Sequence, residues 1–224
     1  MLQVFKNFLT WCPPLLDGAK ITIFLTIFSV TTGLIISVFL ALAKISKNKL
    51  LNALSSAYIF FFRGTPLLLQ LYFMYYGLPK ISPFLTIQDR FLCAYITFSL
   101  NSAAYLAEVV RAAIISIDIG QIEAALSLGL NQTKAMRYVI IPQTISRLVP
   151  PIGNEFILVL KDASLVSIIA LSDITKVTFN IASSSSTSLV YILAMIFYLI
   201  ITAFFSWTFR KLEQKSLNKT EKNF

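Results

Sequence analysis

The chain lacks histidine altogether and has only two cysteines, Cys12 and Cys93, among its 224 residues. Zinc sites draw their ligands from several cysteines and histidines at close spacing, so two distant thiols exclude such a site. The sequence also contains no G-x-x-x-x-G-K-[ST] phosphate-binding loop and no visible nucleophile–base pair. We therefore expect no metal, no cofactor and no enzymatic activity, and the chain cannot itself be an ATP-hydrolysing motor.

Charged residues are also scarce, at 13% of the chain against roughly 25% in a typical soluble domain. Hydrophobic residues reach 57%, and the mean hydropathy is +0.77. A single soluble core cannot cover that much apolar surface. The composition therefore predicts an all-α integral membrane protein that has membrane lipid as its solvent.

The formal net charge is +9, which in a soluble protein would suggest nucleic acid as a partner. Here the basic residues stand beside apolar runs, where they are typical of topology signals and contacts with anionic lipid. We expect no nucleic-acid partner. The first strong apolar run starts only near Ile21 and is long enough to span a bilayer, so we do not expect a cleaved signal peptide.

Five apolar segments are candidates for membrane spans, since about 20 such residues cross a bilayer as a helix. Three are free of charge and two are interrupted by a few charged residues; in chain order the five are Ile21–Ala43, Leu50–Leu78, Phe91–Ala107, Pro151–Leu171 and Thr187–Phe209. The sequence therefore predicts five transmembrane helices.

Lysine and arginine are enriched in the cytoplasmic loops of membrane proteins, and this bias gives the orientation. With the N-terminus outside, twelve basic residues lie inside: Lys44, Lys47, Lys49, Arg111, Lys134, Arg137, Arg147, Arg210, Lys211, Lys215, Lys219 and Lys222. Five lie outside: Lys6, Lys20, Lys80, Arg90 and Lys176. We therefore expect the N-terminus outside and the C-terminus in the cytoplasm. The expected division is an external segment 1–17, a membrane domain 18–212 and a basic cytoplasmic tail 213–224.

The loop between the third and fourth spans, residues 112–149, is then cytoplasmic. Within it, alanine and leucine favour a short helix over Gln121–Leu128, which Asp118 or Gly120 opens and Gly129 ends in a left-handed conformation. A second helix is expected to continue to Pro142. Periodicity alone leaves open that this loop only packs on its own bundle.

Glu123-Ala124-Ala125 is followed by Gly129 six residues after the glutamate and by Pro142 nineteen residues after it. This spacing resembles the EAA loop of binding-protein-dependent ABC importer permeases. Three further runs resemble signatures of the polar amino acid permeases within that superfamily: Phe62–Gln70, Asn101–Arg111 and Asn154–Leu165. The resemblance is to the glutamine, histidine and arginine permease family, with a methionine-permease-like transmembrane domain.

The resemblance implies a cytoplasmic coupling helix between spans three and four, which docks on a separate ATP-binding subunit through Glu123, Ala124, Ala125 and Gly129. It also implies a second permease subunit, either an identical copy or a paralogue, and an external solute-binding protein. The expected location is the bacterial inner membrane. The function it implies is ATP-driven import of a polar amino acid, whose identity the sequence leaves open.

Charges inside spans cost about 2.5–3.5 kcal/mol on insertion scales, so they face partners or water. Four of them are candidates for the substrate path: Glu155, Arg63, Lys161 and Asp162. Each has a structural alternative. Arg63 can satisfy carbonyls freed by Pro66 or pair with Glu108, and Glu155 can serve helix packing. Glu108 and Arg111 are spaced to pair with each other.

A stand-alone secondary transporter or channel for a small polar solute is the alternative function. It would account for the charges in the spans but not for the Glu-Ala-Ala loop. Dependence of transport on a copurifying ATPase separates these two hypotheses.

Overall fold

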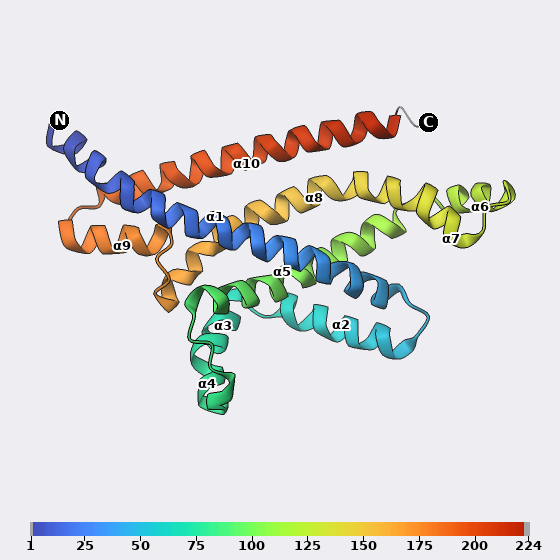
Figure 1. Cartoon of the computed structure of the whole chain (residues 1–224), viewed down its shortest axis with the longest axis horizontal. Helices are drawn as coiled ribbons and strands as arrows, with labels where there is room; N and C mark the ends of the chain where they lie inside the picture. Colours follow the sequence, from blue (N-terminus) through green and yellow to red (C-terminus); the bar gives the residue numbers. More distant parts are fainter. Residues whose placement is uncertain (1, 222–224) are drawn as a thin grey trace.

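The computed structural model describes residues 2–221, and the side chains of residues 9–216. All regular structure in this part of the chain is helical. Three helices are long and apolar enough to cross a membrane: α1 (Leu2–Ile45), α5 (Arg90–Ile115) and α10 (Leu189–Glu221). Together with α8 (Ile141–Asp162) they run lengthwise through the molecule (Figure 1). The predicted helical membrane architecture is confirmed at this level.

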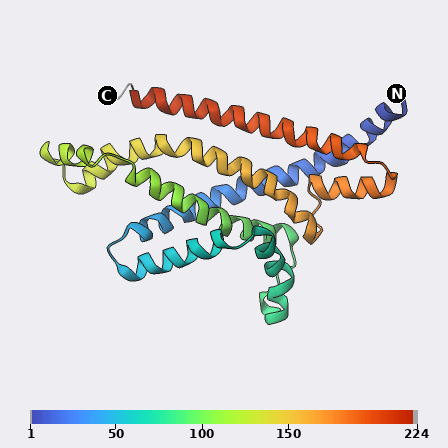
Figure 2. The ribbon, with the colours of Figure 1, turned by 180° about the vertical axis from the view of Figure 1, so that it is seen from behind.

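The second predicted span, Leu50–Leu78, is not one continuous helix. It divides into α2 (Lys49–Gly64), α3 (Leu67–Tyr72), a π-helical turn and α4 (Leu78–Ile81). The division falls at Pro66, because proline drives the preceding residue, here Thr65, into extended backbone (φ −117°, ψ 143°). After this break, α3 and α4 turn away from the main bundle (Figures 1 and 2).

The fourth predicted span, Pro151–Leu171, also differs from the structure. α8 already ends at Asp162, and a 3₁₀ segment, Ala163–Ile169, replaces the last turns expected of it. The helix before it does not end at Pro142 as predicted. A π-helical turn, Met136–Ile140, leads directly into α8, so that Pro142 occupies the first turn, where its missing N–H is tolerated.

Small residues on α5 let α1 approach it closely. Ala103, Ala104 and Ala107 are fully buried, and a Cβ atom added to Gly33 of α1 would lie 3.0 Å from Ser102 Cβ. Close backbone approach through small side chains is the usual packing mode of membrane helices. α1 and α5 therefore form the centre of the bundle.

Aromatic rings join α8 to α10. The Phe156 ring lies 4.6 Å from the ring of Phe205 and 5.3 Å from that of Phe209, centre to centre. These contacts leave most of α10 exposed along its other face, where Leu199 and Ile200 are more than 60% accessible. An apolar helix exposed in this way is suited to lipid.

The two ends of the bundle carry different elements. The start of α1 and the short helix α9 (Ile174–Ser185) lie at one end. The short helix α6 (Ile119–Ser127), the turn between α1 and α2 and the end of α10 lie at the other (Figures 1 and 2). The predicted external segment 1–17 belongs to α1 from Leu2 onward, and residues 222–224 of the predicted tail lie outside the described part.

Candidate functional site

The break between α2 and α3 is held by two side-chain amides. Gln70 Nε2 donates hydrogen bonds to the carbonyls of Phe62 and Thr65, both at 3.0 Å, and to Thr65 Oγ1 at 2.8 Å. Asn101 Nδ2, from α5, donates to the Phe62 carbonyl at 3.1 Å and to Gln70 Oε1 at 3.0 Å. The carbonyls freed by Pro66 are therefore satisfied by Gln70 and Asn101, and the hypothesis that Arg63 serves them is wrong.

Neither Gln70 nor Asn101 is among the site residues that the sequence predicts. The available signal was an uncharged amide, Gln70, placed four residues after a proline within an otherwise apolar run. Such a side chain is costly in lipid unless its hydrogen bonds are made within the protein. Its partner Asn101 is 31 residues away and belongs to another helix, so only the tertiary structure pairs them.

A cavity of about 630 Å³, here called the Glu155 cavity, opens beside this break. The polar side chains that line it come from three predicted candidates, two residues of α5 and the helix break: Arg63, Glu155, Asp162, Asn101, Tyr105 and Thr65. Glu155 Oε1 accepts a hydrogen bond from Ser102 Oγ at 2.9 Å. Lys161 is exposed and is not among the residues that line the cavity.

Arg63 lies with its guanidinium carbon 5.3 Å from the centre of the Tyr105 ring. Within residues 9–216, no carboxylate comes within ion-pairing distance of it. A cation held by an aromatic face alone keeps its hydrogen-bond donors available. Arg63 therefore presents to the Glu155 cavity a guanidinium that is not engaged in a direct ion pair.

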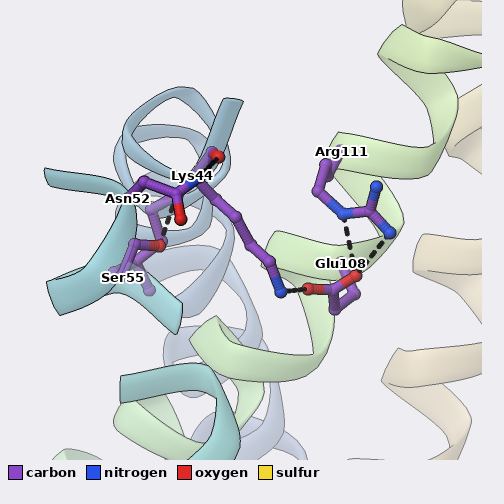
Figure 3. A network of polar contacts seen from close by, with 6 residues as sticks. Lys44, Asn52, Ser55, Glu108 and Arg111 are labelled. Carbon is purple, nitrogen blue, oxygen red and sulfur yellow. Dashed lines mark hydrogen bonds and ion pairs between the residues drawn. The ribbon is translucent and has the colours of Figure 1, made fainter. Parts of the chain in front are cut away.

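Glu108 is occupied by two other cations, so the predicted alternative of an Arg63–Glu108 pair is wrong. Its carboxylate pairs with Arg111 Nη2 at 2.8 Å, as its spacing predicted, and with Lys44 Nζ (Figure 3). Lys44 reaches across from the end of α1, where the Asn52 amide binds its carbonyl (Figure 3). Lys44 lies 64 residues from Glu108, so no local pattern in the sequence indicated this contact.

The EAA segment forms α6, which is slightly displaced from the predicted Gln121–Leu128. Asp118 begins it by accepting a hydrogen bond from the Gly120 N–H at 2.8 Å, and Gly129 ends it with φ +81°. The Leu130 N–H bonds to the Ala125 carbonyl and the Gly129 N–H to the Leu126 carbonyl, as in a Schellman motif. The predicted cap and the predicted left-handed glycine are both confirmed.

Only one residue of the predicted docking set faces the protein. Ala125 is 4% accessible, whereas Glu123, Ala124 and Gly129 are exposed. Leu128, the residue that follows α6, is 84% exposed. α6 lies at the end of the molecule opposite α9 (Figure 1). α6 therefore presents an acidic residue, small residues and an uncovered leucine on one projecting element.

Three features occur together here: a helical bundle with apolar outer faces, a charged cavity beside a broken helix, and a short helix that projects at one end of the bundle. This combination is typical of membrane transport proteins. Residues 33–217 match the family described as binding-protein-dependent transport system inner membrane component. The chain belongs to this family. It is a permease subunit of an ABC importer, and the stand-alone transporter hypothesis is set aside.

The curated relatives are amino-acid permeases. The glutamine transport system permease protein GlnP of Escherichia coli is 36% identical over 204 residues, which cover 91% of this chain and 93% of that protein. The arginine transport system permease protein ArtQ of Bacillus subtilis is 37% identical over 191 residues, covering 84% and 86%. The predicted membership of the polar amino acid permeases is confirmed.

Solved structures agree with this placement. An amino acid ABC transporter crystallised with histidines superposes with a TM-score of 0.88 at 38% identity, over 94% of this chain and 98% of that one. The inward-facing MetNI methionine ABC transporter has a TM-score of 0.74 at 18% identity, over 90% of this chain and 95% of that one. The second likeness shows the fold, which is the methionine-permease-like type that the sequence predicts.

Proposed function

We propose that residues 18–212 form a five-span permease domain in the bacterial inner membrane, with the N-terminus outside and the C-terminus in the cytoplasm. In this arrangement α1, α5 and α10 are continuous spans, and the segments α2–α4 and α8 with its 3₁₀ extension are discontinuous ones. Broken helices are tolerated in membranes where they line a cavity, as α2 and α3 line the Glu155 cavity. The basic tail 213–224 would lie in the cytoplasm.

The grouping of basic residues supports this orientation. Lys44, Arg111 and Arg147 belong to the end of the bundle that carries α6, and so does the end of α10 with Arg210 and Lys211. That end is the one expected in the cytoplasm under the positive-inside rule. Labelling single cysteines introduced at Ser127 and at Ser184 with a membrane-impermeant maleimide, in a variant without Cys12 and Cys93, tests the orientation. Only the cysteine at position 184 should react from outside.

α6 is the element that would dock on the ATP-binding subunit. Its exposed Glu123, Ala124 and Leu128 offer a surface that a cleft can enclose, and the Schellman motif at Gly129 fixes where the helix ends. ATP binding and hydrolysis by that partner would move α6, and with it α5 and α8, as a rigid body. The ATPase is a separate subunit in this proposal.

Two substitutions test the docking surface. Glu123→Lys reverses the charge on the exposed face, and Gly129→Asp places a side chain at φ +81°, which ordinary residues adopt at a cost. Both should abolish copurification of the ATPase and uptake while the protein remains in the membrane. Gln132→Lys, an exposed residue of the same loop outside α6, is the control. Normal uptake by both α6 variants would contradict the docking role.

Further partners follow from the family. A second permease subunit, identical or paralogous, would close the open side of the Glu155 cavity, and an external solute-binding protein would deliver the substrate. Mass measurement of the purified complex distinguishes an identical copy from a paralogue. Membrane lipid covers the apolar outer faces, and no nucleic acid is involved.

The transported solute in this proposal is a polar amino acid, and the charges of the Glu155 cavity carry it. Arg63 would bind the α-carboxylate, and Glu155 or Asp162 would bind the α-ammonium or a cationic side chain. Opposite charges lining one cavity match the two ends of a zwitterion. Lys161 does not line this cavity, so the proposal leaves it out.

Uptake by the reconstituted complex of L-arginine, L-histidine, L-glutamine and L-cystine tests this assignment. Glu155→Gln should raise the half-saturating concentration of the cationic substrates most. Lys161→Gln removes a neighbouring charge outside the cavity and is the matched control. Unchanged uptake by the Glu155 variant would remove this residue from the substrate path. Uptake without ATP would contradict the proposal that import is driven by ATP.

A further inference from the structure

A second cavity, of about 590 Å³, adjoins the Glu155 cavity and shares Arg63, Gly64 and Tyr105 with it. Its other lining residues are Lys44, Ser56, Ile59, Phe60 and Glu108. We call it the Lys44 cavity. It lies toward the end of the bundle that carries α6, because Lys44 is in the last turn of α1 and Glu108 is in the last third of α5.

The two cavities follow one another along the same two helices. On α5, Asn101 lines the first cavity, Tyr105 lines both and Glu108 lines the second, a spacing of i, i+4 and i+7 that keeps them on one face. Seven residues of α-helix correspond to about 10 Å along the axis. Arg63 and Tyr105, which stack on each other, therefore lie between the Glu155 cavity and the Lys44 cavity. We treat the two cavities, or chambers, as successive parts of one transport path.

The charges of the two chambers differ in sign. The Glu155 cavity sets two carboxylates, Glu155 and Asp162, against the single guanidinium of Arg63. The Lys44 cavity sets Arg63 and Lys44 against one carboxylate, Glu108, which is also neutralised by Arg111 from outside the cavity. The first chamber thus favours the cationic groups of a solute, and the second favours an anionic group.

We propose that the Lys44 cavity is a second binding site for the transported amino acid, in which Lys44 and Arg63 hold its α-carboxylate before release. This site rests on the proposed function, amino-acid import. Arg63 borders both chambers, so its guanidinium can keep the carboxylate while the ammonium leaves Glu155 and Asp162. Lys44 can leave Glu108 for the substrate, because Arg111 still neutralises Glu108.

Inhibition of import from the product side tests the second site. The permease and its ATP-binding subunit are reconstituted in proteoliposomes, with the solute-binding protein added outside and L-arginine or L-glutamine enclosed on the cytoplasmic side. Enclosed amino acid should occupy the Lys44 cavity and slow ATP-driven uptake. The α-methyl ester of each amino acid, which lacks the carboxylate charge, should inhibit only at roughly tenfold higher concentration, as the loss of a charge-assisted contact implies.

Variants separate a binding role from a purely structural ion pair. Lys44→Gln should weaken inhibition by the enclosed amino acid roughly tenfold, and Lys44→Arg should restore it. Glu108→Gln removes the competitor of the substrate for Lys44 and should strengthen inhibition. A structural pair predicts instead that Lys44→Gln and Glu108→Gln change import in the same direction. Ser56→Leu fills the Lys44 cavity without altering its charge and should also weaken inhibition by the enclosed amino acid. This variant tests the site without changing the Lys44–Glu108 ion pair.

The result also distinguishes this site from the proposed function. Glu155→Gln should raise the external concentration needed for half-maximal uptake and leave inhibition from inside unchanged. Equal inhibition by amino acid and ester, or parallel effects of Lys44→Gln and Glu108→Gln, would overturn the second site while import itself stands. A wild-type complex that imports no amino acid would overturn the proposed function and the second site together.

Discussion

Arg147 of α8 donates a hydrogen bond to the Ser116 hydroxyl at 2.7 Å, and the same nitrogen also contacts the Ser116 carbonyl. Ser116 ends α5 and stands two residues before Asp118, the residue that begins α6. A second contact joins the Gln143 amide of α8 to the Gln121 side chain of α6 at 3.5 Å. These contacts connect α8 to the joint at which α5 passes into α6.

Loss of the Arg147–Ser116 contact should loosen the coupling of ATP hydrolysis to import. In Arg147→Gln, ATP hydrolysed per amino acid imported should rise by roughly two- to tenfold, the factor implied by a hydrogen bond of about 0.5–1.5 kcal/mol. Simultaneous measurement of phosphate release and uptake in proteoliposomes gives this ratio. Arg137→Gln removes another exposed positive charge, in the π-helical turn that leads into α8, and serves as the control. An unchanged ratio would show that α8 does not transmit the movement of α6 through Arg147.

The amide pair at the helix break predicts a stability effect. Gln70→Leu removes the donor to the Phe62 and Thr65 carbonyls and leaves Asn101 without one partner. Thermal unfolding of the purified protein in detergent should show a loss of about 1–3 kcal/mol, the cost of buried polar groups left unsatisfied. Leu69→Ala, next to it but 61% exposed, should change stability much less. Equal effects of the two substitutions would contradict the role of the amide.

Gly18 allows α1 to pass closely over the start of α9. A Cβ atom added there would lie 2.9 Å from backbone atoms of Asp173 and Ile174, so the backbone itself would have to move. Gly18→Ala should therefore destabilise the protein by about 1–3 kcal/mol, as overpacking does. Gly64→Ala meets no atom within 4 Å and should be close to neutral in the same thermal assay. A melting temperature unchanged by Gly18→Ala would show that the backbone at the start of α9 can shift to accommodate the methyl group at little cost.

Asp173 lies in the connection before α9, is fully buried, and accepts hydrogen bonds from the backbone N–H groups of Thr175 and Lys176, both at 2.9 Å. Burial raises the pKa of its carboxyl above the ordinary value, and those hydrogen bonds oppose the shift only in part. The folded protein therefore holds this proton at a pH where the unfolded chain has lost it. The stability that protonation contributes is fully present below the unfolded pKa of about 3.9 and is lost as the pH rises through the folded pKa.

Asp173→Asn, which mimics the protonated acid, tests the predicted direction in which stability changes with pH. The melting temperature of the wild type relative to this variant should fall as the pH rises from about 4 toward 7. Asp89→Asn alters an exposed carboxylate that also begins a helix, and it controls for the loss of a cap. A wild type that gains stability over Asp173→Asn with rising pH would contradict the sign.

The sequence alone determined the class of protein and the local structure of α6, the proposed coupling helix. Apolar runs and scarce charge predict a membrane protein because lipid is the only solvent that such a surface tolerates. Asp118 and Gly129 bound α6 correctly, because capping and a left-handed glycine are local properties of the backbone. The Glu108–Arg111 pair was predictable for the same reason, since three residues along a helix bring two side chains together.

Only the tertiary structure decided how the charges in the spans are arranged. Lys44 takes the place beside Glu108 that the sequence left open to Arg63, and Gln70 with Asn101 satisfies the break that Arg63 was expected to serve. Arg63, Glu155 and Asp162 come to one cavity while Lys161, adjacent to Asp162, does not. These contacts join helices that lie tens of residues apart, and no local propensity encodes which helices meet. They follow from the packing of small residues between α1 and α5 and from the break at Pro66.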